Sequence, residues 1–378
     1  MKILLAALLG VLALTVTGAA SAGPFFGFAE DATKCADDGG EKLFTEMNKL
    51  GTNTNRVAVF WNADAPTTIQ DQSFLDRMIP VAQKHNIQIV FAIYPSKPSQ
   101  SPTTQAAADA FCSYAVQVMQ RYTYVKKVII GNEPNQPRFW QPIWNSDGSP
   151  ASPAAMEVVL ASCYDKLKAF DSSIDDIGVG LSPRGNDDPS ASSNSSISPV
   201  RWIAALGKAY RASGRTLPIF DTLGHNAYPQ SSAEPPDARH AKGPIDEGDL
   251  ARLMTELHKA FDGTAQPVPG QVSVTIWYLE VGFQSSPDAE LALYTGTETD
   301  AHPVSEAVQA AQLTAAVELA YCQPAVGGFF NFELRDEASL AGWQSGLLRP
   351  DWSAKPAFVS YLEAIAAARA GTISCTSQ

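Results

Sequence analysis

Several signatures of common protein classes are missing from this 378-residue sequence. After the first residues, no stretch approaches the roughly 20 apolar residues that a membrane-spanning helix needs. No GxxxxGK[ST] motif is present, and Gly178-Val179-Gly180 lacks the third glycine of a dinucleotide-binding loop. The five histidines are scattered and form no HExxH motif of a zinc hydrolase. We therefore expect neither a cofactor nor a bound metal.

Positive charge is also scarce. Lysine and arginine number 27 against 39 aspartates and glutamates, which gives a formal net charge of −12. An acidic surface repels phosphate backbones and anionic lipid headgroups. The sequence therefore favours a partner that is neither nucleic acid nor membrane, and we expect the protein to be a monomer.

The N-terminus has the pattern of a secretory signal peptide. Lys2 precedes an apolar run from Ile3 to Leu14, and the small residues Ala20-Ser21-Ala22 follow. This order of basic, apolar and small residues is typical of a segment that is removed on export. Residues 1–22 are therefore predicted to be a signal peptide, and the mature protein is predicted to be secreted. No Pro/Ser/Thr linker divides the remainder, so residues 23–378 are predicted to form a single domain.

Strand-like apolar runs alternate with helix-like segments along the mature chain. A β-α order of this kind predicts a parallel sheet, and eight strands close a (β/α)8 TIM barrel. A doubly wound open sheet has the same β-α order and is the alternative fold. The eight expected strands are 25–28, 56–61, 87–94, 127–131, 177–181, 219–223, 272–279 and 326–332.

Amphipathic segments with apolar residues at spacings of three and four lie between the strands. Strand-to-helix connections are long and rich in Pro, Gly, Ser and Asp, whereas helix-to-strand connections are short. In a barrel, all strand-to-helix loops emerge at the face where active sites are built. The expected helices include 74–85, 106–122, 154–170, 250–261, 304–321 and 357–368.

Two glutamates stand where strands four and seven reach this catalytic face. Glu133 lies in Gly131-Asn132-Glu133-Pro134-Asn135, and Glu280 follows Trp277-Tyr278-Leu279. A single glutamate there is more simply explained as a solvated charge or a structural ion pair, but two on nearly opposite strands favour a shared function. Hydrolysis of a glycosidic bond needs two carboxyl groups, one protonated and one ionised. The pair therefore predicts a glycosidase.

These segments resemble the superfamily of retaining (β/α)8 glycoside hydrolases, of the cellulase and β-xylosidase type. In that superfamily the acid/base is the Glu of an Asn-Glu pair ending strand four, and the nucleophile is the Glu ending strand seven. The resemblance implies that Glu133 is the acid/base, that Glu280 is the nucleophile, and that Asn132 binds the sugar 2-hydroxyl. It also implies that Arg56 on strand two bonds the nucleophile, against the alternative of an ordinary surface ion pair.

Strand six departs from the superfamily pattern. His-x-Tyr is common there, whereas this chain has Gly224-His225-Asn226-Ala227-Tyr228. The resemblance implies that Tyr228 orients the nucleophile. His225 is displaced by one position, and because strand side chains alternate between faces, it is either a substrate-binding residue or a packing residue.

Tryptophans supply the expected sugar platforms, because aromatic faces pack well against the C–H faces of sugar rings. Several of them are expected to belong to the core instead, and Trp202, inside a helix, is assigned to the core. The candidates for stacking on sugars are Trp61, Trp140, Trp144, Trp277 and Trp343.

The five cysteines form no CxxC pair, and in an exported protein they are expected to form disulfides. Cys112 and Cys163 lie at similar heights on neighbouring helices of the expected barrel. Cys322 and Cys375 both lie at its opposite end from the catalytic face. We predict these two pairs and a free Cys35.

The alternative function is a secreted barrel that binds glycans without cleaving them. Fold alone does not decide between binding and catalysis. The presence of both Glu133 and Glu280 favours a hydrolase of carbohydrate substrates, because a binding protein has no need of two catalytic carboxyl groups.

Overall fold

The fold is described from a computed structural model, which covers residues 23–270, 274–287 and 290–375. The predicted signal peptide, residues 1–22, lies outside the described residues. No helix in the described part of the chain is both long enough and apolar enough to cross a bilayer.

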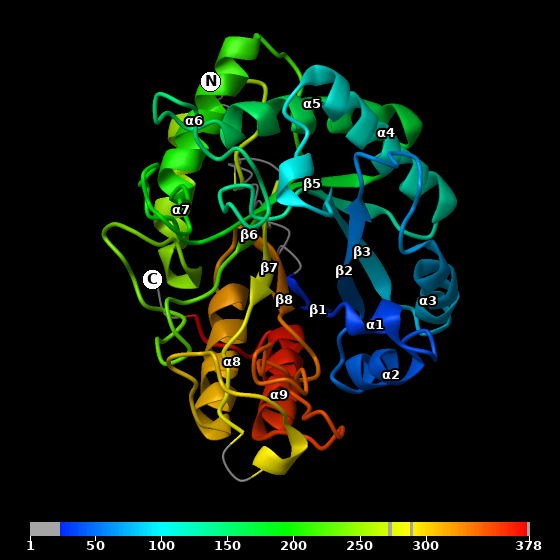
Figure 1. The fold of residues 1–378 in the computed structure, drawn as a ribbon. Coiled ribbons are helices and arrows are strands. Elements are labelled where there is room, and N and C mark those ends of the chain that lie inside the picture. The colour runs from blue at the N-terminus through cyan, green and yellow to red at the C-terminus, as the bar shows by residue number, and fades with distance from the viewer. Residues whose placement is uncertain (1–22, 271–273, 288–289, 376–378) are drawn as a thin grey trace, which may run out of the picture.

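Eight parallel strands close into a barrel in the order of the sequence, and β1 pairs with β8 (Figure 1). This closure confirms the predicted TIM barrel and excludes the open doubly wound sheet. The strands are β1 Phe25–Ala29, β2 Thr54–Trp61, β3 Gln88–Pro95, β4 Lys127–Ile130, β5 Asp175–Leu181, β6 Thr222–Asn226, β7 Ile276–Val281 and β8 Val326–Asn331.

Helices surround the strands (Figure 1). The α-helices are α1 Ala32–Cys35, α2 Glu41–Lys49, α3 Gln72–Lys84, α4 Gln105–Arg121, α5 Ser152–Phe170, α6 Pro199–Ser213, α7 Leu250–Phe261, α8 Glu306–Tyr321 and α9 Pro356–Ala370. Short 3-10 turns are η1 Pro98–Gln100, η2 Glu247–Asp249 and η3 Leu291–Leu293.

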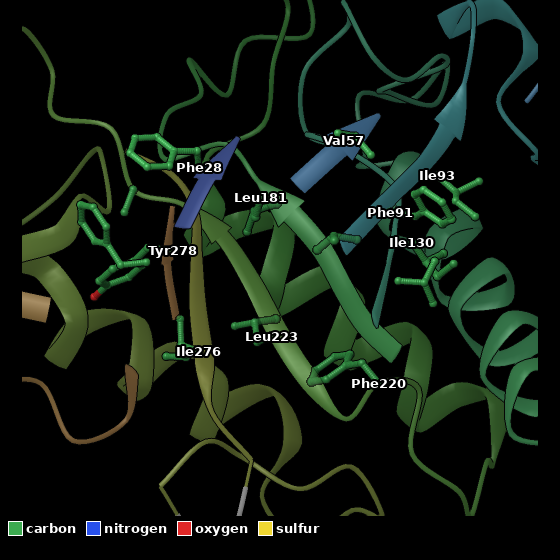
Figure 2. Close-up of a cluster of buried hydrophobic side chains, with 14 of the residues drawn as sticks. Phe28, Val57, Phe91, Ile93, Ile130, Leu181, Phe220, Leu223, Ile276 and Tyr278 are labelled. Atoms are coloured by element: carbon green, nitrogen blue, oxygen red, sulfur yellow. The ribbon is translucent and has the colours of Figure 1, made fainter. Parts of the chain in front are cut away.

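The alternation of side chains along each strand divides the core into two layers. The outer layer lies between the strands and the helices, and Figure 2 shows part of it, with Phe91 and Ile93 of β3 close to Ile130 of β4. The inner layer fills the barrel with the intervening residues, among them Ala92 and Leu279. The barrel is therefore packed with side chains, and its functional groups are confined to one end.

The boundaries of β6 correct the sequence prediction. A strand was expected at residues 219–223, whereas β6 runs from Thr222 to Asn226. Ile219 and Phe220 are buried, which explains their strand-like appearance, but they precede the first paired residue. Thr222 is the residue that pairs with Ile177 of β5. The strand therefore extends three residues further toward the catalytic face than expected.

Both predicted disulfides are present. Cys112 on α4 is bonded to Cys163 on α5, and Cys322 is bonded to Cys375. Cys35 is free and exposed. Comparable heights on neighbouring barrel helices were therefore sufficient to predict the first pair, and a shared position at the end opposite the catalytic face was sufficient to predict the second.

Candidate active site

Glu280 lies near the end of β7 and is directed into the barrel by an irregularity in the strand. His225 of β6 pairs with Tyr278, but the next residue, Asn226, pairs with Glu280, so Leu279 is an extra residue on β7. A bulge of this kind re-aims the side chains that follow it. In a regular strand Glu280, two residues after the outward-facing Tyr278, would also face the helices.

Two side chains hold the Glu280 carboxylate. Arg56 Nη1 lies 2.8 Å from Glu280 Oε1, and the hydroxyl of Tyr228 donates to Oε2 at 3.1 Å. Arg56 is buried and also donates through Nη2 to Asn132 Oδ1 at 2.8 Å. Burial lowers the pKa of Arg56, but the charge of Glu280 and smaller contributions from Tyr94, Asp31 and Tyr228 together outweigh this and leave the pKa above its usual value. One guanidinium thus ties Glu280 of β7 to Asn132, which follows β4.

Glu133 follows β4 and has a different environment. Asn226 Nδ2 donates to Glu133 Oε1 at 3.0 Å. Burial, and next the charge of Glu280, raise the pKa of Glu133 to about 7. The Glu133 backbone adopts φ 40°, a conformation uncommon for residues other than glycine, and its N–H donates to Gly180 O at 2.7 Å. At neutral pH Glu133 can therefore hold a proton, beside a partner that is paired with arginine.

Asn226 and Arg184 belong to this site and were not identified from the sequence. Asn226 is fully buried and occupies the first position of an Asn-x-Tyr spacing, where the superfamily pattern has His-x-Tyr. That spacing is the feature of the sequence from which Asn226 could have been identified as a site residue. Arg184, in the loop after β5, donates through Nη1 to Pro229 O at 2.5 Å, and its charge lowers the pKa of Glu133.

His225 is not part of the site, and the structure places it in the packing role. It pairs with Tyr278 in the sheet, and like Tyr278 it points away from the barrel interior, so it is fully buried. His225 Nε2 lies 2.7 Å from Ile245 O. Burial lowers the pKa of His225 to about 4, so the ring is neutral at physiological pH. Of the two roles considered for His225, these contacts therefore favour packing over substrate binding.

Of the candidate tryptophans, Trp343 lies beside the glutamate pair. Its ring centroid is 5.5 Å from that of Tyr228 and 5.1 Å from that of Phe332, which follows β8. Trp343 is only partly buried, so these three rings offer an aromatic surface next to Glu280.

The other tryptophans lie elsewhere, and several of them belong to the core, as expected. Trp61 is buried against Phe111 of α4, and Trp140 is buried in the same outer core layer. Trp277 fills the opposite end of the barrel interior, 4.6 Å from the ring of Phe25 at the start of β1. Trp144 donates to Ser195 O in a neighbouring loop. Trp202 is buried, as predicted.

An acidic hollow of about 320 Å³ lies where β1 and β8 end, and Glu30, Glu333 and Arg335 contribute to its lining. Burial raises the pKa of Glu30 to about 7, although three backbone N–H groups bond to its carboxylate. Burial, and next the charge of Glu30, raise the pKa of Glu333 to about 10. Glu333 therefore keeps its proton at neutral pH.

The sequence predicted no bound metal. However, Glu234, His240 and Asp246 form a group whose geometry could hold a cation. These residues belong to the loop between β6 and α7. They do not contact Glu133 or Glu280 through any of their hydrogen bonds or ion pairs among the described residues.

Solved structures with a similar fold are glycoside hydrolases. A family 39 glycoside hydrolase from Bacteroides cellulosilyticus WH2 matches with a TM-score of 0.62 at 16% identity, over 90% of this chain and 63% of that one. A glucosidase from Croceicoccus marinus matches with a TM-score of 0.60 at 12% identity, over 91% and 66%. GH5_18 from Streptomyces cattleya matches with a TM-score of 0.55 at 14% identity, over 92% and 80%.

This chain thus spans just under two thirds of the length of the first two of these proteins. No protein-family model and no curated protein sequence matches it. At such low identities the likeness establishes the barrel fold, whereas the chemistry depends on the residues of the site itself.

Proposed function

We propose that this protein is a retaining glycoside hydrolase acting on β-linked sugars, with Glu133 as acid/base and Glu280 as nucleophile. The observation that carries the proposal is the contrast between the two carboxyl groups. Glu133 has its pKa raised to about 7 by burial and is bonded to an amide, whereas Glu280 is paired with Arg56. A retaining glycosidase requires one protonated and one ionised carboxyl group. The glycoside hydrolases of similar fold support this assignment.

In the first step, a Glu280 carboxylate oxygen attacks the anomeric carbon while the bond to the leaving oxygen breaks. Glu133 gives its proton to that oxygen, so the leaving group departs as an alcohol and a glycosyl ester remains on Glu280. In the second step, water attacks the anomeric carbon and Glu133 accepts its proton. Glu280 is released as a carboxylate, and the two inversions give net retention.

Arg56 and Tyr228 support this cycle by holding both oxygens of Glu280 in fixed positions. As the ester forms, the Glu280 charge is lost and Arg56 keeps its second contact with Asn132. Asn132 is then oriented to bind the sugar 2-hydroxyl, an interaction that strengthens in the transition state. The aromatic group of Tyr228, Phe332 and Trp343 offers a surface for the sugar ring.

Replacement of each glutamate by alanine, combined with azide rescue, tests the two roles. In Glu133→Ala, activated aryl glycosides should still form the glycosyl-enzyme, and azide should release it as the β-glycosyl azide. In Glu280→Ala no covalent intermediate can form, so activity should fall by several orders of magnitude, and azide should yield the α-glycosyl azide. NMR of the products identifies the anomer.

The product configurations make the test decisive. Reversed anomers would exchange the roles of the two glutamates, and full activity of both variants would refute the proposed site. Glu363→Gln, an exposed carboxylate on α9, serves as the matched control and should behave as wild type. Affinity for glycans with no turnover of any β-glycoside or polysaccharide would indicate instead a glycan-binding barrel.

We further propose that the protein is secreted as a monomer after removal of residues 1–22. The two disulfides suit an oxidising compartment. N-terminal sequencing of the exported protein should begin near Gly23, and light scattering should give the mass of one mature chain. A retained leader or a dimer would contradict these expectations.

A further inference from the structure

The loop between β6 and α7 holds a compact group of acidic residues around one histidine. His240 Nδ1 lies 2.8 Å from Asp249 Oδ2, and His240 Nε2 lies 3.1 Å from Glu234 Oε1. Asp246 Oδ2 lies 3.8 Å from His240 Nδ1. One donor atom from each of Glu234, His240 and Asp246 lies within 4.8 Å of the others. Three carboxyl groups therefore surround a single imidazole.

Asp246 supplies an independent indication that this group binds a ligand. Its side chain is only 4% exposed, and neither carboxylate oxygen has a hydrogen-bond partner among the described residues. The capping box at the start of η2 places the Asp246 side chain toward the N–H of Asp249, but that N–H donates to the main-chain oxygen of Asp246 at 3.1 Å. Leaving a buried carboxyl group without partners costs free energy. A bound cation would remove that cost.

The residues around Asp246 supply little positive charge to stabilise its buried carboxylate. Arg252, the nearest arginine along the chain, donates to the main-chain oxygens of His240 and Gly243. The ion pairs of Glu234, Asp246 and Asp249 among the described residues are all with His240, so no lysine or arginine neutralises these carboxyl groups.

We propose that Glu234, His240 and Asp246 form a binding site for a divalent metal ion of the zinc class. One imidazole nitrogen with carboxylate oxygens is a donor set that suits Zn²⁺, whereas Ca²⁺ prefers oxygen ligands throughout. The bond from Nδ1 to Asp249 leaves Nε2 directed at Glu234 Oε1, 3.1 Å away, and at the amide nitrogen of Gln230, 2.8 Å away, and a bound metal ion would take the place of that amide. Asp249 then orients the histidine through its second nitrogen, the usual arrangement at zinc sites.

A metal ion here would fasten the loop that carries Tyr228. Residues 234, 240 and 246 are spread along this loop, which is also bonded to its neighbours. Ser232 Oγ accepts from Gln284 N at 2.8 Å, and Ile245 N donates to Pro183 O at 2.9 Å. The metal would therefore stabilise one side of the glutamate pair without contacting it, and its binding does not depend on the proposed glycosidase activity.

The test uses the tag-free mature chain stripped with a chelator and titrated with Zn²⁺. Calorimetry and elemental analysis should show one bound equivalent, and the melting temperature should rise on Zn²⁺ addition and fall back with chelator. Ca²⁺ should bind more weakly. Asp246→Asn, which keeps the side-chain shape, should weaken Zn²⁺ binding at least about tenfold, and Asp249→Asn should weaken it by about 10- to 100-fold.

His258→Gln is the matched control, because His258 is a histidine paired with an aspartate, Asp262, outside this loop. It should leave Zn²⁺ affinity unchanged. Circular dichroism of each variant confirms that it is folded, and Glu234→Gln provides a second, less buried test of the site. Equal Zn²⁺ binding by wild type, Asp246→Asn and Glu234→Gln would overturn the proposal. A melting temperature of the wild type that does not change on Zn²⁺ addition would also overturn it. The group around His240 would then be an ion-pair cluster and not a metal site.

Discussion

Asn226 is the side chain through which the site controls the proton on Glu133. It donates to Glu133 Oε1, a contact that favours the ionised form and so lowers the pKa of Glu133. Activity should require protonated Glu133 and should therefore decline as pH rises through about 7. Asn226→Ala removes the donor, so the alkaline limb of kcat/KM should move to higher pH. The pH profile of kcat/KM measures this shift.

A purely structural role of Asn226 would lower activity equally at every pH. The displacement of the alkaline limb therefore distinguishes control of the Glu133 proton from a loss of folded enzyme. Asn145→Ala, an exposed amide in the loop after β4, should leave the profile where it is. A shift of the alkaline limb to lower pH would contradict the assigned hydrogen bond.

At the residue scale, the sequence indicated the glutamate pair but not all of its partners. Glu133, Glu280, Arg56, Asn132 and Tyr228 were selected from motifs, and the structure brings them together. His225 points to the other face of β6 from Asn226, because a shift of one residue exchanges the two faces of a strand.

The tryptophans show the same limit of sequence reasoning. A large aromatic residue has the same periodic signal in a core layer as in a binding surface. Trp61 and Trp277 each continue the alternation of their strands and are buried by it. Only the contacts of Trp343 with Tyr228 and Phe332, which come from different loops, distinguish it. Such contacts between distant segments cannot be derived from local periodicity.

At the scale of elements, α4 and α5 are joined by packing and by a disulfide. Cys112 and Cys163 are both fully buried and are separated by 51 positions in the sequence. A crosslink across a loop of this length typically stabilises a protein by about 2–4 kcal/mol. We expect the Cys112→Ala/Cys163→Ala variant to lose about this much free energy of unfolding, measured by urea denaturation. Cys35→Ala, at the exposed free cysteine, should change it little.

The strand and helix elements were largely predictable, because each one carries its own pattern. Apolar runs of strand length alternate with amphipathic helices, which predicts a parallel sheet, and the presence of eight such runs favours its closure into a barrel. The bulge in β7 was not predictable, because no Gly or Pro marks it in Trp277-Tyr278-Leu279-Glu280. It depends on how β7 pairs with β6, and so does the inward direction of Glu280.

At the scale of the whole molecule, stability is linked to protons held by buried carboxyl groups. The pKa of Glu133 is about 7 in the folded protein against an ordinary value of 4.5. The folded state binds this proton more tightly than the unfolded chain does. Its stabilising contribution is therefore complete below about pH 4.5 and is lost as pH rises through 7.

Glu133→Gln should remove this dependence. Relative to wild type, the variant should gain stability as pH rises from 5 to 8, by at most roughly 3 kcal/mol. Melting curves of both proteins at each pH measure the difference. Glu363→Gln should follow the wild type throughout. A Glu133→Gln variant whose stability relative to wild type falls toward pH 8 would show that the pKa of Glu133 is not raised by folding.

The pairing of β1 with β8 has a consequence for how the protein is made. Seven of the eight strand pairs join segments that follow one another in the sequence, but this seam joins Phe25–Phe28 to residues 328–331, near the opposite end. A chain emerging from the ribosome can pair its early strands, yet it must keep an open edge until the last strand has been synthesised. Open edges invite pairing with other chains. Slow translation of the final segment should therefore increase aggregation more than an equal delay between any two earlier strands.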